Sequence, residues 1–414
     1  MAGRHLVLCF DGTWNTPDNG PAPTNVVKLL RALPSRAKGV CQIVFYDKGV
    51  GTGNFTDKIV GGASGVGLTE NIIDGYRFLG NNYAAGDEIY IFGFSRGAYT
   101  ARSLAGLIAL AGILKPEHLG RDLRRVIEIC RSDVERAEKQ DEIRKLDCAR
   151  HEEVRIRCVG VWDTVGSLGI PGDLGRQLYL KPYYFYDVEL SPLVDVGLHA
   201  IAIDEKRSAF APTLWGSADG KPHDGQIVEQ VWFPGVHSNV GGSYPDAGLS
   251  DIALDWMVKR LKRHTALAFD DDCLRRTCNP RVDGMGYESR SALYVSSKVY
   301  PYQRLINQTL PDGRGLGEWF RETFEKFDRR NLMPEGMRTV NEMLHISALD
   351  RWALKAVLHD ASKPTDKQRL YRPPNLEAVI RARNIAVVGR DGERLPADIV
   401  PWPSHDERPA LEPA

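Results

Sequence analysis

The sequence predicts an α/β protein built on one mostly parallel β-sheet, and three observations support this fold class. Short apolar runs bounded by Gly, Asp or Pro recur along the chain. These runs do not alternate with polar residues, which is typical of strands buried on both faces. Helical segments lie between successive runs, as in βαβ units. The predicted strands are residues 5–10, 41–46, 88–94, 154–162, 197–203 and 228–233.

Helices are predicted between these strands, and one long charged segment forms an insertion. The regular helices span residues 24–33, 67–83 and 97–113. The insertion, residues 116–150, has apolar residues at helical spacing on a charged background. It forms either a pair of surface helices or a cap over a pocket, and the sequence leaves both open.

After His237 the pattern predicts more helices separated by irregular segments rich in Pro and Arg. We expect a catalytic domain over residues 1–265 and a helical or irregular extension over residues 266–414 that packs on it and ends in a loose, Pro-rich tail. The predicted helices in this part are residues 252–268, 316–327 and 334–344.

Composition restricts the class of protein. The 414 residues include 54 Lys and Arg against 54 Asp and Glu, with 43% hydrophobic residues, as in ordinary globular proteins. A formal net charge of zero argues against a nucleic-acid partner. No apolar run reaches the roughly 18 residues of a spanning helix, so only a peripheral contact with a membrane stays open. The oligomeric state does not follow from the sequence.

The cysteines and the N-terminus bear on localisation. Seven cysteines, an odd number without zinc-site spacing, favour a reducing cytoplasm and buried thiols. The apolar segment 6–10 is too short for the core of a signal peptide. We therefore expect a cytoplasmic protein, or one secreted by a route that needs no cleavable signal.

The most specific motif is Gly93-x-Ser95-x-Gly97, which follows a predicted strand directly and precedes a predicted helix. A serine at such a turn adopts strained backbone angles, and the two glycines remove side chains that would collide with neighbouring segments. This nucleophile elbow predicts an α/β-hydrolase-like fold with Ser95 as the nucleophile.

A serine hydrolase also needs donors for the oxyanion that forms on its substrate. The backbone N–H of Arg96, at the start of the helix, is one candidate. The strand at 5–10 ends in a sharp turn at Asp11-Gly12-Thr13, and the backbone N–H of Gly12 or Thr13 is the candidate for the second donor. Alternatively, Asp11 caps this turn and the loop has no catalytic part.

The general base is predicted to be His237. Among the later histidines it alone follows an apolar strand directly, on a loop loosened by Pro234-Gly235 and Gly241-Gly242. Such a loop can bring an imidazole to the serine, which needs a base to remove its proton.

Two carboxylates compete to orient this histidine. Asp163 ends the strand at 154–162, and Asp204 ends the strand at 197–203. Asp204 is followed closely by Lys206 and Arg207, so a local ion pair explains it, whereas Asp163 has no adjacent cation. Many enzymes of this fold place the acid one strand later, which would favour Asp204. We prefer Asp163.

Five blocks of the sequence belong together: Phe10-Asp11-Gly12-Thr13-Trp14-Asn15, Thr24-Asn25-Val26, Gly93-Phe94-Ser95-Arg96-Gly97-Ala98, Val161-Trp162-Asp163-Thr164-Val165-Gly166 and Trp232-Phe233-Pro234-Gly235-Val236-His237-Ser238-Asn239-Val240-Gly241-Gly242. With them the sequence resembles the uncharacterised α/β-hydrolase domain family that includes phospholipase effectors of type VI secretion systems. The resemblance covers roughly residues 4–260 and implies Ser95 as nucleophile, Asp163 as acid and His237 as base. It also implies hydrolysis of a lipid-like ester by a phospholipase or esterase activity.

The predicted chemistry needs no cofactor and no metal. A protein of the same fold that binds a partner without catalysis is the main alternative. A nucleotide-dependent enzyme that uses the glycine-rich stretch 49–67 is a weaker one, because that stretch lacks the Gly-Lys-Ser/Thr of a phosphate-binding loop.

Overall fold

The structure is a computed structural model, and it describes nine parts of the chain. They are residues 3–12, 22–49, 63–165, 189–207, 210–289, 303–309, 333, 336–360 and 368–403.

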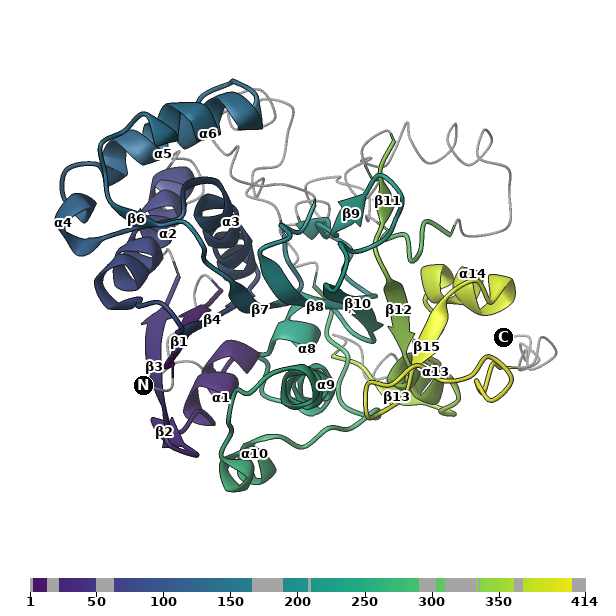
Figure 1. Ribbon diagram of the computed structural model, residues 1–414. Coiled ribbons are helices and arrows are strands. Elements are labelled where there is room, and N and C mark those ends of the chain that lie inside the picture. Colours follow the sequence, from purple (N-terminus) through teal and green to yellow (C-terminus); the bar gives the residue numbers. More distant parts are fainter. Residues whose placement is uncertain are drawn as a thin grey trace.

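Within these residues, one nine-stranded sheet runs through the molecule in the order β15-β12-β10-β8-β7-β4-β1-β3-β2 (Figure 1). All neighbouring strands are parallel except the hairpin pair β2 and β3. Every predicted strand is present, and the predicted mostly parallel α/β-hydrolase-like fold is confirmed. The strands are β1 (His5–Phe10), β2 (Arg36–Ala37), β3 (Val40–Asp47), β4 (Glu88–Phe94), β7 (Ile156–Trp162), β8 (Val194–Ala202), β10 (Ile227–Phe233), β12 (Glu342–His345) and β15 (Ala386–Val388).

Helices cover both faces of this sheet. Figure 1 shows α2, α3, α5 and α6 on one side of it and α1, α8, α9 and α10 on the other. The helices among the described residues are α1 (Asn25–Arg31), α2 (Ala63–Asn82), α3 (Arg96–Ala111), α4 (Pro116–Leu119), α5 (Leu123–Arg131), α6 (Arg136–Arg144), α8 (His237–Gly241), α9 (Gly248–His264), α10 (Asp271–Thr277), α13 (Ile346–Trp352) and α14 (Pro374–Ala382).

The burial of the strands explains their unbroken apolar sequence. Along β1, Leu6 and Leu8 pack on the side of α2 and α3, whereas Val7 and Cys9 pack on the side of α9. All four side chains are fully buried. Because both faces need apolar side chains, the period-two alternation of a half-exposed strand is absent.

The insertion at 116–150 forms α4, α5 and α6. Its helix α5 buries Leu123, Val126, Ile127 and Cys130, the residues that the helical spacing picks out. These join the apolar cluster that α2 and α3 form against the sheet. The insertion is therefore firmly anchored on this side of the fold, and its role as a cap stays a prediction.

The prediction of a helix over 334–344 is wrong. Residues 338–339 form the short strand β11 and residues 342–345 form β12, which lies parallel to β10. The Trp232 Nε1–H donates to Glu342 at 2.8 Å, which fixes the strand at this position. Pairing with a neighbouring strand therefore overrode local helical preference, an effect that a single segment cannot reveal.

The other predictions for the C-terminal half have mixed outcomes. The helix predicted over 252–268 is present as α9, slightly earlier in the chain. The helix predicted over 316–327, and most of the Pro-rich tail, lie outside the described residues. The domain division at residue 265 stays a prediction, although the extension is not only helical, because β12 and β15 belong to the central sheet.

Gly97 lets the serine turn lie against the end of β1. A Cβ atom on Gly97 would fall 2.2 Å from the carbonyl oxygen of Phe10 and 2.5 Å from that of Asp11. We expect Gly97→Ala to lower the free energy of unfolding by about 1–3 kcal/mol or more, because backbone must move to admit the methyl group. Urea denaturation measures this loss.

Gly120 provides the matched control. It lies in the helical region at φ −76°, and nothing is close to the site of its missing Cβ. The Gly120→Ala variant should be unchanged or more stable by about 0.4–1 kcal/mol. Equal losses in the two variants would show that the close contact at Gly97 does not matter.

Candidate active site

Ser95 lies at the turn between β4 and α3, as the motif predicts. Its backbone has φ 60° and ψ −121°, in a region that side chains other than glycine rarely adopt. The Ser95 N–H donates to the carbonyl of Trp162 at 3.1 Å, which ties the turn to the end of β7. This strained and tethered turn has the backbone geometry expected of a nucleophile elbow.

His237 is the first residue of α8, directly after β10 and the turn at Gly235. Its ring packs on Phe94, the residue before Ser95, with the ring centroids 4.6 Å apart. This packing depends on Gly241, because a Cβ there would lie 2.0 Å from the Phe94 ring. The described contacts include no hydrogen bond between Ser95 and His237, and such bonds are often long until substrate binds.

The Thr24-Asn25 block holds the end of α8 in place. The Asn25 side-chain amide donates to the carbonyls of Val240 at 2.8 Å and Ser250 at 2.9 Å. Thr24 also forms an isolated bridge with Gly242. A segment that follows β1 therefore positions the helix that carries His237.

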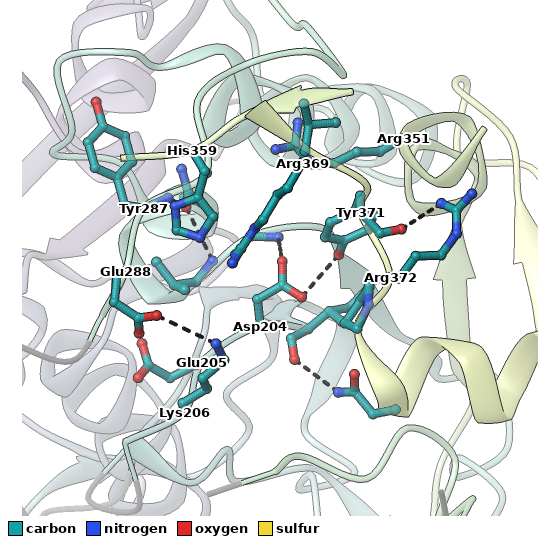
Figure 2. A pocket seen from close by; sticks show the side chains of 18 of the residues that line it. Asp204, Glu205, Lys206, Tyr287, Glu288, Arg351, His359, Arg369, Tyr371 and Arg372 are labelled. Atoms are coloured by element: carbon teal, nitrogen blue, oxygen red, sulfur yellow. Dashed lines mark hydrogen bonds and ion pairs between the residues drawn. The ribbon is translucent and has the colours of Figure 1, made fainter. Parts of the chain in front are cut away.

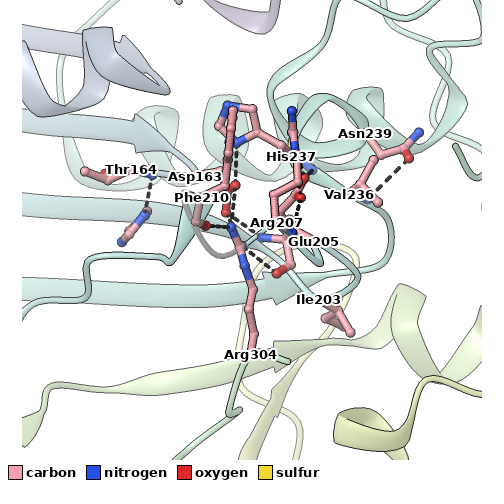
Figure 3. Close-up of polar contacts among 12 residues, drawn as sticks. Asp163, Thr164, Ile203, Glu205, Arg207, Phe210, Val236, His237, Asn239 and Arg304 are labelled. Carbon is pink, nitrogen blue, oxygen red and sulfur yellow. Dashed lines mark hydrogen bonds and ion pairs between the residues drawn. The ribbon is translucent and has the colours of Figure 1, made fainter. Parts of the chain in front are cut away.

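Asp163 pairs directly with His237. Its Oδ2 lies 2.6 Å from His237 Nδ1, and both side chains are buried (Figure 3). Asp163 has φ 42°, and its backbone N–H donates to Ala200 at 2.7 Å. The Ala202 N–H donates to its Oδ1 at 2.9 Å. The end of β8 thus orients the carboxylate that ends β7.

Arg304 is a partner of Asp163 that the sequence analysis missed. Its guanidinium lies 2.6 Å from Asp163 Oδ1 and 3.0 Å from Oδ2, and neither side chain is exposed. The same guanidinium donates to the carbonyls of Ala202 and Phe210. In the sequence, Arg304 stands out only as one of several arginines in an irregular segment. It is 141 positions from Asp163, and residues that far apart cannot be matched from their spacing.

A second ion pair lies on the other side of His237. The buried Glu205 carboxylate accepts the His237 backbone N–H at 3.3 Å and pairs with Arg207 at 2.9 Å. Arg207 in turn covers the Phe210 ring, whose edge-on contact with the His237 ring has a centroid distance of 4.9 Å. The imidazole is therefore enclosed by Phe94, Phe210 and this ion pair, as Figure 3 shows in part.

The electrostatics keep Asp163 ionised and His237 neutral. Burial opposes ionisation of Asp163, but the Arg304 charge and the His237 hydrogen bond hold its pKa well below the usual range. Burial lowers the pKa of His237, and Asp163 offsets only part of this effect. With its Nδ1–H directed at Asp163, neutral His237 has the lone pair on Nε2 that a general base requires.

Asp204, the alternative acid, has different partners. Its carboxylate accepts the Gly235 N–H at 2.7 Å and the Tyr371 hydroxyl at 3.1 Å. Burial raises the pKa of Asp204 despite these hydrogen bonds. Asp204 therefore holds the turn that precedes His237, and no hydrogen bond links it to the imidazole among the described contacts.

The expected oxyanion donors are only partly described. The Arg96 N–H, at the first turn of α3, has no acceptor among the described residues. The Gly12 N–H donates to its neighbour Asp11 Oδ1 at 2.7 Å, and Thr13 lies outside the described residues. Burial raises the pKa of Asp11 to about 6, against hydrogen bonds from Thr24, Gly12 and Tyr46. The capping role of Asp11 is thus present, and the donor role of this loop stays a prediction.

Several other features bear on function. Most of the glycine-rich stretch, residues 50–62, lies outside the described residues. Among the residues that are described, no cluster of His, Cys, Asp and Glu could hold a metal ion. All seven cysteines are described, and all are free thiols. No described helix has the length and apolar character needed to cross a membrane.

Residues 4–260, more than half of the chain, match the family described as the type VI secretion phospholipase effector Tle1-like catalytic domain. The uncharacterised protein YEL023C of Saccharomyces cerevisiae is 31% identical over 232 residues, which are 50% of this chain and 32% of that protein. The chain thus spans about a third of the length of this relative.

Two solved structures also align with the chain. An uncharacterised protein from Pseudomonas aeruginosa has a TM-score of 0.41 at 18% identity, covering 68% of this chain and 49% of that one. The Tle1 effector bound to the VgrG spike from the type 6 secretion system has a TM-score of 0.33 at 18% identity, covering 60% of this chain and 52% of that one.

The buried pair of Arg304 and Asp163 can be tested by its contribution to stability. Arg304→Met leaves the Asp163 carboxylate buried with His237 as its remaining side-chain partner. We expect a loss of about 3–5 kcal/mol in the free energy of unfolding, the usual cost of breaking a buried ion pair from one side. Guanidinium or urea denaturation measures it.

Arg381→Met is the control, because Arg381 pairs with Glu377 on the exposed face of α14. Exposed pairs of this spacing contribute about 0.3–0.5 kcal/mol. If Arg304→Met were as mild as Arg381→Met, the buried pair would have no special place in the fold.

Proposed function

The chain belongs, through residues 4–260, to the family of Tle1-like type VI secretion phospholipase effectors, and from this membership we propose that it is a serine hydrolase of lipid carboxylic esters. The family supports the coarser statement that the domain hydrolyses lipid esters. The observation that most supports the finer proposal is the 2.6 Å contact of His237 with Asp163, on a helix that packs against the residue before Ser95.

The proposed reaction begins with attack of Ser95 Oγ on the ester carbonyl carbon, while His237 Nε2 removes the hydroxyl proton. The negative charge that forms on the carbonyl oxygen is stabilised by backbone N–H groups, with Arg96 and the Gly12-Thr13 loop as candidates. When the carbon–oxygen bond to the leaving alcohol breaks, His237 returns the proton to that alcohol and an acyl-serine remains. Water then attacks the acyl-serine carbonyl while His237 takes its proton. His237 returns that proton to Ser95 Oγ as the fatty acid is released.

The surroundings of His237 suit this cycle. Imidazole must be neutral to accept the proton, and the lowered pKa of His237 favours that form. Asp163 stabilises the imidazolium that forms when His237 takes the proton. Arg304 neutralises part of the negative charge of Asp163 and so weakens this stabilisation. We infer that Arg304 keeps the carboxylate ionised and fixed in place, at some cost to its attraction for the imidazolium.

The substrate class and the location follow from the family and are part of the proposal. A lipid substrate requires that the protein contact a membrane from its surface. The Tle1 effector has been solved bound to the VgrG spike, which is a property of that protein. For this chain we propose secreted delivery, as its family suggests.

The nucleophile is tested by Ser95→Ala. Because triad residues act together, the loss of the hydroxyl should reduce turnover of a short p-nitrophenyl ester by on the order of 10⁴-fold or more. It should also abolish covalent labelling by a fluorophosphonate, which reacts only with an activated serine. The exposed Ser35, changed to alanine, is the matched control and should label fully.

Two outcomes would contradict this proposal. Undiminished turnover by the Ser95→Ala variant would place the nucleophile elsewhere. Absence of labelling and turnover in the unaltered protein, on esters of graded chain length with and without vesicles, would favour a binding protein of the same fold.

The choice between the two acids is tested by Asp163→Asn and Asp204→Asn. Asparagine at 163 would favour the wrong histidine tautomer, so kcat should fall by on the order of 10⁴-fold with little change in KM. Asparagine at 204 can still accept the Gly235 N–H, so this variant should remain at least about a hundredfold more active than the other. The reverse order would make Asp204 the acid.

A further inference from the structure

Among the described residues, a cavity lies beside Arg304, the partner of the candidate acid Asp163. It has a volume of about 380 Å³ and is formed by the ends of β8 and β10, the β13 (Val357–Leu358) and β14 (Gln368–Arg369) pair, and the start of α14 (Figure 2). Arg304 and Glu205 form part of its wall, whereas Ser95, Asp163 and His237 do not line it. Its size is that of a site for a small organic molecule.

Arg351 is the most unusual residue in this wall. Its side chain is buried, and its guanidinium donates to the carbonyls of Val282 at 2.5 Å and Gly284 at 2.8 Å. Its Nε has no hydrogen-bond partner, and no described carboxylate forms an ion pair with it. Burial lowers the pKa of Arg351, but arginine remains protonated in proteins, so a buried positive charge faces this region without a direct counter-ion.

The carboxylates of the cavity are engaged elsewhere. Glu205 pairs with Arg207, and Glu288 pairs with Lys206 at 3.5 Å. Asp204 accepts hydrogen bonds from Gly235 and Tyr371, and burial raises its pKa towards the neutral form. None of the three forms an ion pair with Arg351 among the described contacts. Asp204 acts on that guanidinium at longer range, and the Tyr371 ring centroid lies 5.1 Å from it.

Arg369 and His359 add further hydrogen-bond donors to the wall of this cavity. Figure 2 shows Arg369 and His359 extending into the space above Asp204. The described residues place no carboxylate within ion-pair distance of Arg369. His359 is 8% exposed, and its Nδ1 has no partner. A buried, unpartnered ring nitrogen beside two arginines is costly unless a ligand or water satisfies it.

We propose that this cavity binds a phosphate group, either as inorganic phosphate or as a small phosphate monoester. Two guanidinium groups match the charge and the paired oxygens of a phosphate dianion, and the imidazole supplies another donor. The volume leaves room beside the phosphate for a substituent about the size of glycerol.

The site is connected to the candidate acid through Arg304. This arginine lines the cavity and holds Asp163 through its guanidinium. A phosphate bound in the cavity would attract the same positive charge, so occupancy would alter the environment of Asp163. Binding itself requires no hydrolysis and does not rest on the proposed function.

Isothermal titration calorimetry tests the proposal on the full chain, with inorganic phosphate and glycerol 3-phosphate as separate probes and glycerol as the uncharged control. Ionic strength is held constant with NaCl, because exposed charges are screened by salt. We expect saturable binding of at least one phosphate probe and none of glycerol. Preference for glycerol 3-phosphate indicates a ligand derived from a lipid headgroup, and equal or better binding of inorganic phosphate indicates free phosphate.

Arg369→Gln should weaken phosphate binding by about tenfold, the equivalent of one charge-assisted contact. Arg369 is exposed and lies on a short strand, so this variant should fold normally. Arg381→Gln, a change of the same type outside the cavity, should bind as the unaltered protein does. Ser95→Ala should also bind normally, which separates this site from the catalytic proposal.

The proposal is overturned if neither phosphate probe binds. It is also overturned if glycerol binds as well as glycerol 3-phosphate does, or if Arg369→Gln and Arg381→Gln weaken binding equally. In the last case the effect would reflect overall charge and not this cavity.

Discussion

The candidate site depends on a buried row of charged and polar groups, Arg304, Asp163 and His237, at the ends of β7 and β8. Removing a guanidinium and a carboxylate from water is costly, and hydrogen bonds to both groups offset part of that cost. Here Ala202 supplies both a carbonyl and an N–H, and Phe210 supplies another carbonyl. The backbone of three separate segments is thereby fixed around one carboxylate.

In the proposed triad, the acid Asp163 contacts an arginine as well as its histidine. An arginine with two contacts to the acid keeps it ionised and prevents it from rotating, so the histidine tautomer is defined before substrate binds. The same arginine reduces the negative potential at the imidazole. If His237 acts as the proposed base, this arrangement would favour a well-positioned neutral imidazole over strong stabilisation of the imidazolium.

Two residues with strained backbone angles lie at this same edge of the sheet. Ser95 and Asp163 both have positive φ, and they follow the neighbouring parallel strands β4 and β7. Strain of this kind persists only where the surroundings impose it, here through the Trp162 carbonyl, the Ala200 carbonyl and the close approach of Gly97 to Phe10. Parallel strands bring residues that are far apart in sequence to one edge of the sheet, where Ser95, Asp163 and His237 follow β4, β7 and β10.

The sequence by itself determined the sheet, because strands buried on both faces must be apolar throughout, and it determined the serine turn, because only glycines fit beside it. It also singled out His237 and Asp163, which the structure brings within hydrogen-bonding distance. Only the tertiary structure revealed β12, whose four residues become a strand through pairing with β10, and the approach of Arg304 to Asp163. Both depend on contacts between residues more than a hundred positions apart, and local composition carries no record of such contacts.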